Sequence, residues 1–528
     1  MPRKSLATVL TALALVLVPS AVAGPGLMVG VSDDAIKGQP DEVVTLARDL
    51  GLEAIRISVL WEPGKTELSG GEAASLDQAV SKAGGIRLVP VFYASSGDSA
   101  PTTPEAREQY CTFVRSLLAR YPTINDAVIW VEPNKSFFWK PQFASDGSSA
   151  APAAYVALLA RCYDVLHQLR SGVNVIAAST SPRGNDRPSA RSNISHSPGN
   201  FIRRMGEAYR ALGRQTRIFD TVGHHAYGEH SAERPWKRHE GSTTISQGDW
   251  GRLMQALYDA YDGTAQPIPG EEGVTIWYLE MGYQTTIDAS KASLYHGSES
   301  DPHPVASAAG SEPSAPAPAD DSLAPDQGTQ LLDGVRLAFC QPYVAAFFNL
   351  TLWDEPDLSR WQSGVLWADR AQKGSYGAFK SVISEVDRGG IDCSRLKGGQ
   401  VEAAFEPKTE VEVENVLWPK AGSFNWRNTL WRLRVMTEED ARYVGQIVLV
   451  GRAGRTPQAR GPQRTILRVR GELKAGYLAF VKFPARRLPA GRYQMKVTLT
   501  SKANASRRAT IVSPAFVVKP PPGKRARR

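Results

Sequence analysis

Hydrophobic and polar positions alternate in two different periods between residue 27 and about residue 390. Short apolar runs of strand length are each followed by a longer segment with one apolar face, as in a helix. In the second run, for example, Ile55, Ile57 and Val59 alternate with Arg56 and Ser58. The expected strands cover residues 27–31, 53–61, 86–93, 127–131, 173–179, 218–227, 274–280 and 344–353. The expected helices cover residues 40–52, 74–83, 104–120, 153–169, 200–212, 250–261, 330–340 and 376–386.

Eight strand–helix units in succession predict a parallel α/β fold, and the count is that of a (β/α)8 TIM barrel. A doubly wound open sheet is the alternative. That fold usually carries a Gly-x-Gly-x-x-Gly loop after an early strand, and no such loop follows one here. We therefore expect a barrel domain over residues 24–395.

The pattern changes beyond residue 400, where short alternating runs replace the helices. Seven such runs, separated by turn residues, predict an all-β Ig-like sandwich over residues 401–519. Residues 297–326 are rich in Ser, Ala and Pro and predict an insertion after the seventh barrel strand. This insertion is either a flap over the barrel mouth or a tolerated surface segment.

The N-terminus has the pattern of a secretory signal peptide over residues 1–23. Arg3 and Lys4 precede an apolar stretch too short to span a bilayer, and Ala21-Val22-Ala23 is a small-residue cleavage site. A retained anchor is the alternative, and no later segment is long and apolar enough to span a membrane. We expect a secreted protein, and the signal is typical of a bacterium.

The chain has 528 residues and a net charge of +9, much of it near the C-terminus. Residues 520–528 are expected to form a disordered basic tail, either solvated or in contact with anionic cell-wall polymers. No motif indicates nucleic-acid binding, and a monomer is expected.

Four cysteines suit an exported protein with two disulfide bonds. No C-x-x-C pair is present, which argues against zinc. Cys111 and Cys162 fall in successive expected helices, whereas Cys340 and Cys393 flank the last strand and helix of the barrel. Of the three pairings that four cysteines allow, we expect Cys111 with Cys162 and Cys340 with Cys393.

Two expected core strands end in a glutamate, Glu132 and Glu280. Burying a carboxylate is costly unless another group pairs with it or uses it. In a barrel the carboxyl ends of the strands converge on one pocket, so the two side chains are expected to meet there. The alternative is that each is a buried acid satisfied by an arginine.

Other strands bring further polar and aromatic side chains to the same end of the expected barrel. Arg56 lies in the second strand, His225 and Tyr227 end the sixth, and Trp353 ends the eighth. Carboxylates, a guanidinium, an imidazole and aromatic rings together suit a sugar, because rings stack on its faces and polar groups meet its hydroxyls. Each of these residues has a purely structural alternative as a core or ion-pair partner.

Four motifs resemble those of the clan A glycoside hydrolases, the cellulase- and xylosidase-like superfamily of TIM barrels. They are Trp130-Val131-Glu132-Pro133-Asn134 with Phe138-Trp139-Lys140-Pro141, Val222 to Gly228, Leu279-Glu280-Met281-Gly282-Tyr283, and Trp353 with Trp361-Gln362-Ser363-Gly364. The resemblance covers residues 27 to about 390.

The resemblance implies a retaining glycoside hydrolase that cleaves O-glycosidic bonds by double displacement, without a metal or cofactor. Glu132 would be the acid/base and Glu280 the nucleophile, with their carboxyl groups about 5–5.5 Å apart. The substrate-binding residues it implies are Arg56, Asn134, His225, Tyr227, Trp353 and Trp139.

One position departs from the family pattern, because Val131 stands where an Asn usually precedes the acid/base. That Asn contacts the 2-hydroxyl of the sugar, so the departure points to an unusual sugar or a degenerate enzyme. One alternative is therefore a catalytically inactive carbohydrate-binding or adhesion protein, and another is a transglycosidase that uses the same residues. A metal-dependent hydrolase built on His224, His225 and His230 is disfavoured, because successive strand residues point to opposite faces.

Overall fold

The computed structural model describes residues 26–308, 325–396, 404–408, 410–411, 413–419, 430–451, 464–476, 478–484, 488–502 and 505–518. The expected signal peptide, residues 309–324 of the expected insertion and the basic tail lie outside these ranges. In the ranges described, no helix combines the length and the apolar character that crossing a bilayer requires.

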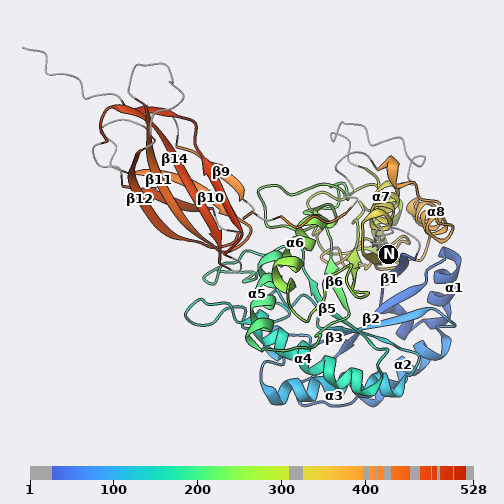
Figure 1. The fold of residues 1–528 in the computed structure, drawn as a ribbon. Helices are drawn as coiled ribbons and strands as arrows, with labels where there is room; N and C mark the ends of the chain where they lie inside the picture. The colour runs from blue at the N-terminus through green and yellow to red at the C-terminus, as the bar shows by residue number, and fades with distance from the viewer. Residues whose placement is uncertain are drawn as a thin grey trace, which may run out of the picture.

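Eight parallel strands close into a barrel in the order β1 to β8, with β1 hydrogen-bonded to β8 (Figure 1). Closure confirms the (β/α)8 prediction over the open-sheet alternative. The strands are β1 Met28–Ser32, β2 Ala54–Leu60, β3 Arg87–Tyr93, β4 Asp126–Ile129, β5 Asn174–Thr180, β6 Thr221–His225, β7 Thr275–Met281 and β8 Val344–Leu350.

An α-helix follows each strand and covers the outside of the barrel. The helices are α1 Pro40–Leu50, α2 Gly70–Lys82, α3 Pro104–Arg120, α4 Ala151–Leu169, α5 Pro198–Ala211, α6 Trp250–Tyr261, α7 Gln327–Cys340 and α8 Ser375–Asp387. Five short 3-10 helices lie in the loops at Ala35–Lys37, Gly97–Ser99, Gln247–Asp249, Ala289–Leu294 and Cys393–Arg395.

Alternation along the strands builds two apolar layers. Side chains that point into the barrel, such as Val89, Val91 and Leu279, form an inner cluster, and the intervening residues pack against the helices. Val131 belongs to the inner cluster and is only 5 % exposed. Much of the barrel interior is thus a packed core, and any site is expected toward the carboxyl ends of the strands and in the loops that follow them.

Two disulfide bonds tie the helical layer, and both expected pairings are confirmed. Cys111 on α3 is bonded to Cys162 on α4, and Cys340 at the end of α7 is bonded to Cys393. Each closes a loop of just over fifty residues within the barrel domain.

The C-terminal module is an antiparallel β-sandwich whose two sheets enclose a separate apolar core. One sheet has the order β13-β10-β9, and the other has the order β12-β11-β14-β15 with β16 also paired to β14. Eight strands are described where seven were expected, because the last run is divided in two. They are β9 Val413–Leu417, β10 Trp431–Thr437, β11 Ala441–Gly451, β12 Arg464–Leu473, β13 Ala479–Phe483, β14 Gly491–Ser501, β15 Arg508–Val512 and β16 Phe516–Val518.

Buried ion pairs join the sandwich to helices α5 and α6 of the barrel (Figure 1). Arg203 Nε lies 2.8 Å from Asp259 Oδ2, and its Nη1 donates to the carbonyl oxygen of Glu438 at 2.7 Å. From the sandwich, Arg507 pairs with Asp259 and with Glu439. These side chains are 5 % exposed or less, so each charge depends on its partner across the interface.

Candidate active site

The chain leaves β4 three residues before Glu132 and continues in an irregular path. Trp130 and Glu132 have positive φ angles of 70° and 35°, which cost about 1–3 kcal/mol each for residues other than glycine. The path is held by hydrogen bonds from the Trp130 N–H to the carbonyl of Phe92 and from the Glu132 N–H to the carbonyl of Ser179, both 3.0 Å. Strain of this kind at a strand end is typical of a functional site.

Glu280 lies within β7 and is surrounded by groups that favour its ionised form. Arg56 Nη1 is 2.9 Å from Glu280 Oε1, and the Tyr227 hydroxyl donates to Oε2 at 3.1 Å. Burial acts to raise the pKa of Glu280, but His225, Arg56 and Tyr227 together outweigh it and leave the pKa below its ordinary value. Glu280 is therefore a carboxylate near neutral pH.

His225, at the end of β6, brings the two glutamates together. Its Nδ1 lies 3.0 Å from Glu132 Oε1 and 3.3 Å from Glu280 Oε2. These two oxygens therefore cannot be farther apart than about 6.3 Å, the sum of the two distances. The other ring nitrogen contacts the Ser179 hydroxyl at 3.0 Å, which fixes the orientation of the imidazole. The structure thus brings together Glu132, Glu280, Arg56, His225 and Tyr227.

A cavity of about 300 Å³ opens beside Glu280. Asp33, on its wall, accepts hydrogen bonds from the backbone N–H groups of Ala35 and Leu352, and burial raises its pKa to about 6. Asp33 directly follows β1 and was not among the site residues expected from the sequence. The lining consists of Ser32, Asp33, Asp34, Arg56, Ser58, Glu280, Leu350, Thr351, Trp353, Asp354, Glu355, Pro356 and Trp361.

Two tryptophans from the loop after β8 line this cavity. Trp361 is 36 % exposed and stacks on Tyr227, with the ring centroids 5.1 Å apart and the planes at 20°. Trp353, the ring expected from sequence, has the guanidinium of Arg370 over it at 4.1 Å. Trp361 is part of one of the four sequence motifs, but its position in the sequence does not reveal that its ring contacts Tyr227.

A buried ion pair holds the same loop. Lys373 Nζ lies 2.7 Å from Asp354 Oδ1, both side chains are fully buried, and burial lowers the pKa of Lys373 to about 8. Gly364 is required nearby, because a Cβ there would lie 2.4 Å from the carbonyl carbon of Trp353. The ion pair between Lys373 and Asp354 thus holds in place the loop that carries both tryptophans.

Two residues expected to contact substrate are instead buried in the loop packing. Asn134 is fully buried, and its amide bonds the carbonyls of Ser181 and His196 and the N–H of Ser181. Trp139 is also fully buried and packs edge-on against Trp130 and Tyr155. We therefore leave Asn134 and Trp139 out of the site and assign them to the support of the Glu132 loop.

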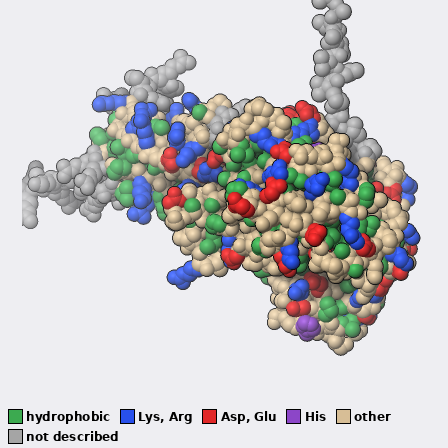
Figure 2. All heavy atoms as spheres, turned by 90° about the horizontal axis from the view of Figure 1, so that it is seen from below, with side chains coloured by type: hydrophobic (Ala, Val, Ile, Leu, Met, Phe, Trp, Pro, Cys, Tyr) green, Lys and Arg blue, Asp and Glu red, His purple; other side chains and the backbone are tan. Residues whose placement is uncertain are grey.

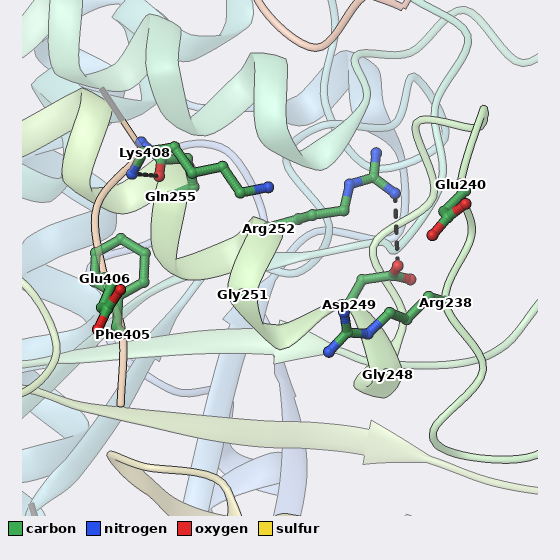
Figure 3. A pocket seen from close by; sticks show the side chains of 10 residues that line it. All are labelled: Arg238, Glu240, Gly248, Asp249, Gly251, Arg252, Gln255, Phe405, Glu406 and Lys408. Atoms are coloured by element: carbon green, nitrogen blue, oxygen red, sulfur yellow. Dashed lines mark hydrogen bonds and ion pairs between the residues drawn. The ribbon is translucent and has the colours of Figure 1, made fainter. Parts of the chain in front are cut away.

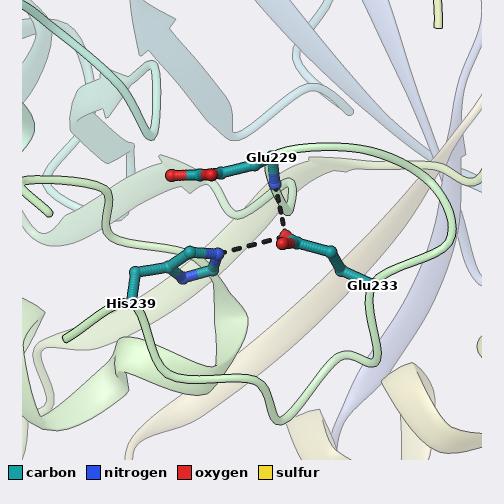
Figure 4. Close-up of side chains that lie close together, drawn as sticks. All are labelled: Glu229, Glu233 and His239. Atoms are coloured by element: carbon teal, nitrogen blue, oxygen red, sulfur yellow. Dashed lines mark hydrogen bonds and ion pairs between the residues drawn. The ribbon is translucent and has the colours of Figure 1, made fainter. Parts of the chain in front are cut away.

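A cluster with metal-ligating side chains lies in the loop after β6, formed by Glu229, Glu233 and His239 (Figure 4). Both imidazole nitrogens of His239 are engaged, Nε2 with Glu233 at 3.1 Å and Nδ1 with Asp249 at 2.8 Å. Burial opposes the charged imidazolium, but the two carboxylates outweigh it and raise the pKa of His239 to about 9. Because carboxylates engage both nitrogens of His239, we assign this cluster to loop stability.

The histidines of the metal-hydrolase alternative have separate partners. His224 contacts the Thr180 hydroxyl and the carbonyl of Ile245, whereas His225 contacts the two glutamates. The two side chains point away from each other, as expected for successive strand residues.

A second cavity, of about 160 Å³, lies where α6 meets the segment leading to the sandwich (Figure 3). Arg252 and Asp249 form an ion pair at 3.6 Å on its wall, and Gln255 accepts from the N–H of Lys408. It shares no lining residue with the cavity beside Glu280, so the two cavities are distinct.

The fold and the site together define a (β/α)8 barrel protein with paired glutamates at the mouth of the barrel. No protein-family model and no curated protein sequence matches the chain. Three solved structures are similar to the chain. A family 39 glycoside hydrolase from Bacteroides cellulosilyticus WH2 has 14 % identity and a TM-score of 0.46, and the match covers 81 % of this chain and 75 % of that one. A monomeric β-xylosidase from Caulobacter crescentus CB15 has 14 % identity and a TM-score of 0.42, with 89 % of this chain and 96 % of that one covered, and a β-glucuronidase from Bacteroides uniformis has 10 % identity and a TM-score of 0.39, with 94 % of this chain and 46 % of that one covered. The chain thus spans about half the length of that β-glucuronidase. These likenesses are distant and do not by themselves assign a function.

Proposed function

We propose that the chain is a retaining glycoside hydrolase that cleaves O-glycosidic bonds of a poly- or oligosaccharide by double displacement. The observation that carries the proposal is the contact of Glu132 and Glu280 with the same nitrogen of His225. The limit of about 6.3 Å applies to these two oxygens, and it supports the short carboxyl separation of about 5–5.5 Å found in retaining enzymes. This spacing favours retention.

In this mechanism Glu280 is the nucleophile, because it is held ionised by Arg56 and Tyr227. Its carboxylate attacks the anomeric carbon while Glu132 donates a proton to the leaving oxygen, which gives a covalent glycosyl-enzyme. Glu132, now a carboxylate, then removes a proton from water as the water attacks the anomeric carbon and releases Glu280.

The cavity beside Glu280 is suited to the sugar on the non-leaving side of the bond. Trp361 and Trp353 offer aromatic surface for its apolar face, and Asp33 and Asp34 offer acceptors for its hydroxyls. Val131 supplies no hydrogen bond at the position that usually holds the 2-hydroxyl.

The test is hydrolysis of aryl glycosides, in a panel covering the common β-linked sugars. Glu280→Gln is expected to lower kcat at least 1,000-fold, and Glu132→Gln is expected to affect substrates with poor leaving groups most. Glu105→Gln, an exposed glutamate at the start of α3, is the matched control and should leave activity unchanged.

Proton NMR of the first product distinguishes the stereochemistry, since retention releases the β-anomer from a β-glycoside. Appearance of the α-anomer first would contradict double displacement. If the chain binds oligosaccharides but hydrolyses none of the panel, the inactive carbohydrate-binding protein is the correct assignment. Transfer of the glycosyl unit to added sugar acceptors would indicate a transglycosidase.

We also propose that the protein is exported. The two disulfide bonds support an oxidising compartment, since such bonds are rare in the cytosol. N-terminal sequencing of protein recovered from the medium should give a start near Gly24, and retention of the first residues on a membrane would contradict this.

A further inference from the structure

Positive charge is divided very unevenly between the two domains. Residues 401–519 contain 22 Lys and Arg against 9 Asp and Glu, a net charge of +13. Residues 1–400 contain 36 Lys and Arg against 44 Asp and Glu, a net charge of −8. The sandwich is therefore a basic module attached to an acidic barrel, a distribution that affects what the protein associates with.

The interface with the barrel makes the outer surface of the sandwich still more basic. Glu438 and Glu439 are buried against the barrel, and Asp440 is paired with Arg204 of α5. These acids thus neutralise charge at the junction instead of on the free surface. Figure 2 shows Lys and Arg side chains spread over the sandwich end of the molecule.

Three of the cations lie next to one another on the outer face of the sheet β13-β10-β9. Arg432 and Arg434 of β10 and Lys482 of β13 are exposed, while the residues between them point into the sandwich core. Phe480, 42 % exposed, lies beside them, with the two guanidinium groups 5.8 Å and 5.4 Å from its ring centre. We call Arg432, Arg434, Phe480 and Lys482 the basic face.

Fold stability does not account for the basic face. Arg432 lies directly opposite Lys482 across the β10–β13 pair, and like charges at opposed positions destabilise a sheet. Within the ranges that the structure describes, none of the three cations forms an ion pair with a carboxylate. An external anion would remove this repulsion.

We propose that the basic face binds an acidic polysaccharide and holds the protein on it. Residues two apart on a strand are about 7 Å apart and neighbouring strands about 4.8 Å, so the cations form a flat array that suits an extended chain. Phe480 adds a ring on which a sugar can stack. The choice of a glycan over other polyanions rests on the proposed glycosidase function, and the surface itself is independent of the catalytic residues.

The experiment measures binding of the full secreted chain to polygalacturonate, with neutral dextran as comparison, by isothermal titration calorimetry at 20, 150 and 500 mM NaCl. Polygalacturonate should bind and dextran should not, and the affinity should fall as salt rises because the contacts are ionic. The triple variant Arg432→Glu, Arg434→Glu, Lys482→Glu should lose at least tenfold in affinity at 20 mM NaCl.

A matched control reverses three exposed barrel cations, Lys65→Glu, Arg115→Glu and Arg191→Glu, which changes the net charge equally. The proposal requires this control to bind within twofold of wild type, and circular dichroism must show that both variants are folded. Equal losses in the two variants, or undiminished binding by the basic-face variant, would overturn it. So would preferential binding of duplex DNA or of vesicles of anionic lipid at equal charge concentration. Hydrolysis of aryl glycosides, assayed in parallel, separates a failure here from a failure of the proposed catalysis.

Discussion

The hydrogen bond from Tyr227 to Glu280 offers the sharpest test of the site. Tyr227→Phe removes only the hydroxyl that donates to Glu280 Oε2 at 3.1 Å. The ring remains buried and can still stack on Trp361, so packing is preserved. Any change in activity then reports on the lost hydrogen bond.

The expected magnitude follows from the charge on the acceptor. A hydrogen bond to a charged group contributes about 1.5–3 kcal/mol, which corresponds to about a 10- to 150-fold fall in kcat/KM. The fall should be partial, because Arg56 and His225 still hold Glu280 ionised near neutral pH. Loss of a donor also raises the pKa of Glu280, so the acidic limb of the pH profile should move to higher pH.

The assay is kcat/KM from pH 4 to pH 9 on the aryl glycoside that the wild-type protein hydrolyses best. Tyr121→Phe is the control, because the Tyr121 hydroxyl also donates to a carboxylate, that of Asp77 at 2.9 Å, but on the outside of the barrel. A Tyr227→Phe variant whose rate and acidic limb both match wild type would refute the assignment of Glu280 as a nucleophile poised by this contact.

Three further predictions concern stability, each measured by chemical or thermal unfolding. Replacing Cys111 and Cys162 together by serine should cost about 4 kcal/mol, because the bridge closes a loop of 51 residues in the unfolded chain; a loss under 1 kcal/mol would contradict this. Arg203→Met should cost about 3 kcal/mol and expose the sandwich junction to proteolysis, since it leaves Asp259 with one buried cation fewer; unchanged proteolysis would argue against a fixed interface. The folded-state pKa of His239, about 9, exceeds its ordinary 6.5, so its contribution is complete below pH 6.5 and is lost as pH rises through 9; in His239→Gln this part of the pH dependence should disappear.

Most of the architecture could be predicted from the sequence because hydrophobic periodicity is a local property. The helices over residues 104–120 and 250–261 begin and end where expected, and every expected barrel strand is present. β4 ends two residues earlier than expected, at Ile129, because Trp130 turns into the left-handed region. No local pattern signals that turn, since it is held by hydrogen bonds that Trp130 and Glu132 donate to carbonyl groups of β3 and β5.

The residues of the candidate site could likewise be predicted only in part from the sequence. Strand-end positions selected Glu132, Glu280, His225 and Tyr227, because barrel topology brings such positions together, and Arg56 was selected from within the second strand. Asn134 and Trp139 belonged to the same motif but are buried, since the loop after β4 folds back on itself. Trp361 joins the site only through the path of a long loop, which is fixed by contacts distant in sequence.

By itself, the sequence determined the order and type of the elements, the two-domain division and the pair of glutamates, because these depend on periodicity and on position along a strand. Only the tertiary structure decided that one nitrogen of His225 contacts both carboxylates, that the sandwich buries its acids against the barrel, and that Arg432 faces Lys482. The physical reason is that contacts between distant segments depend on packing and register, and no short stretch of sequence contains both partners.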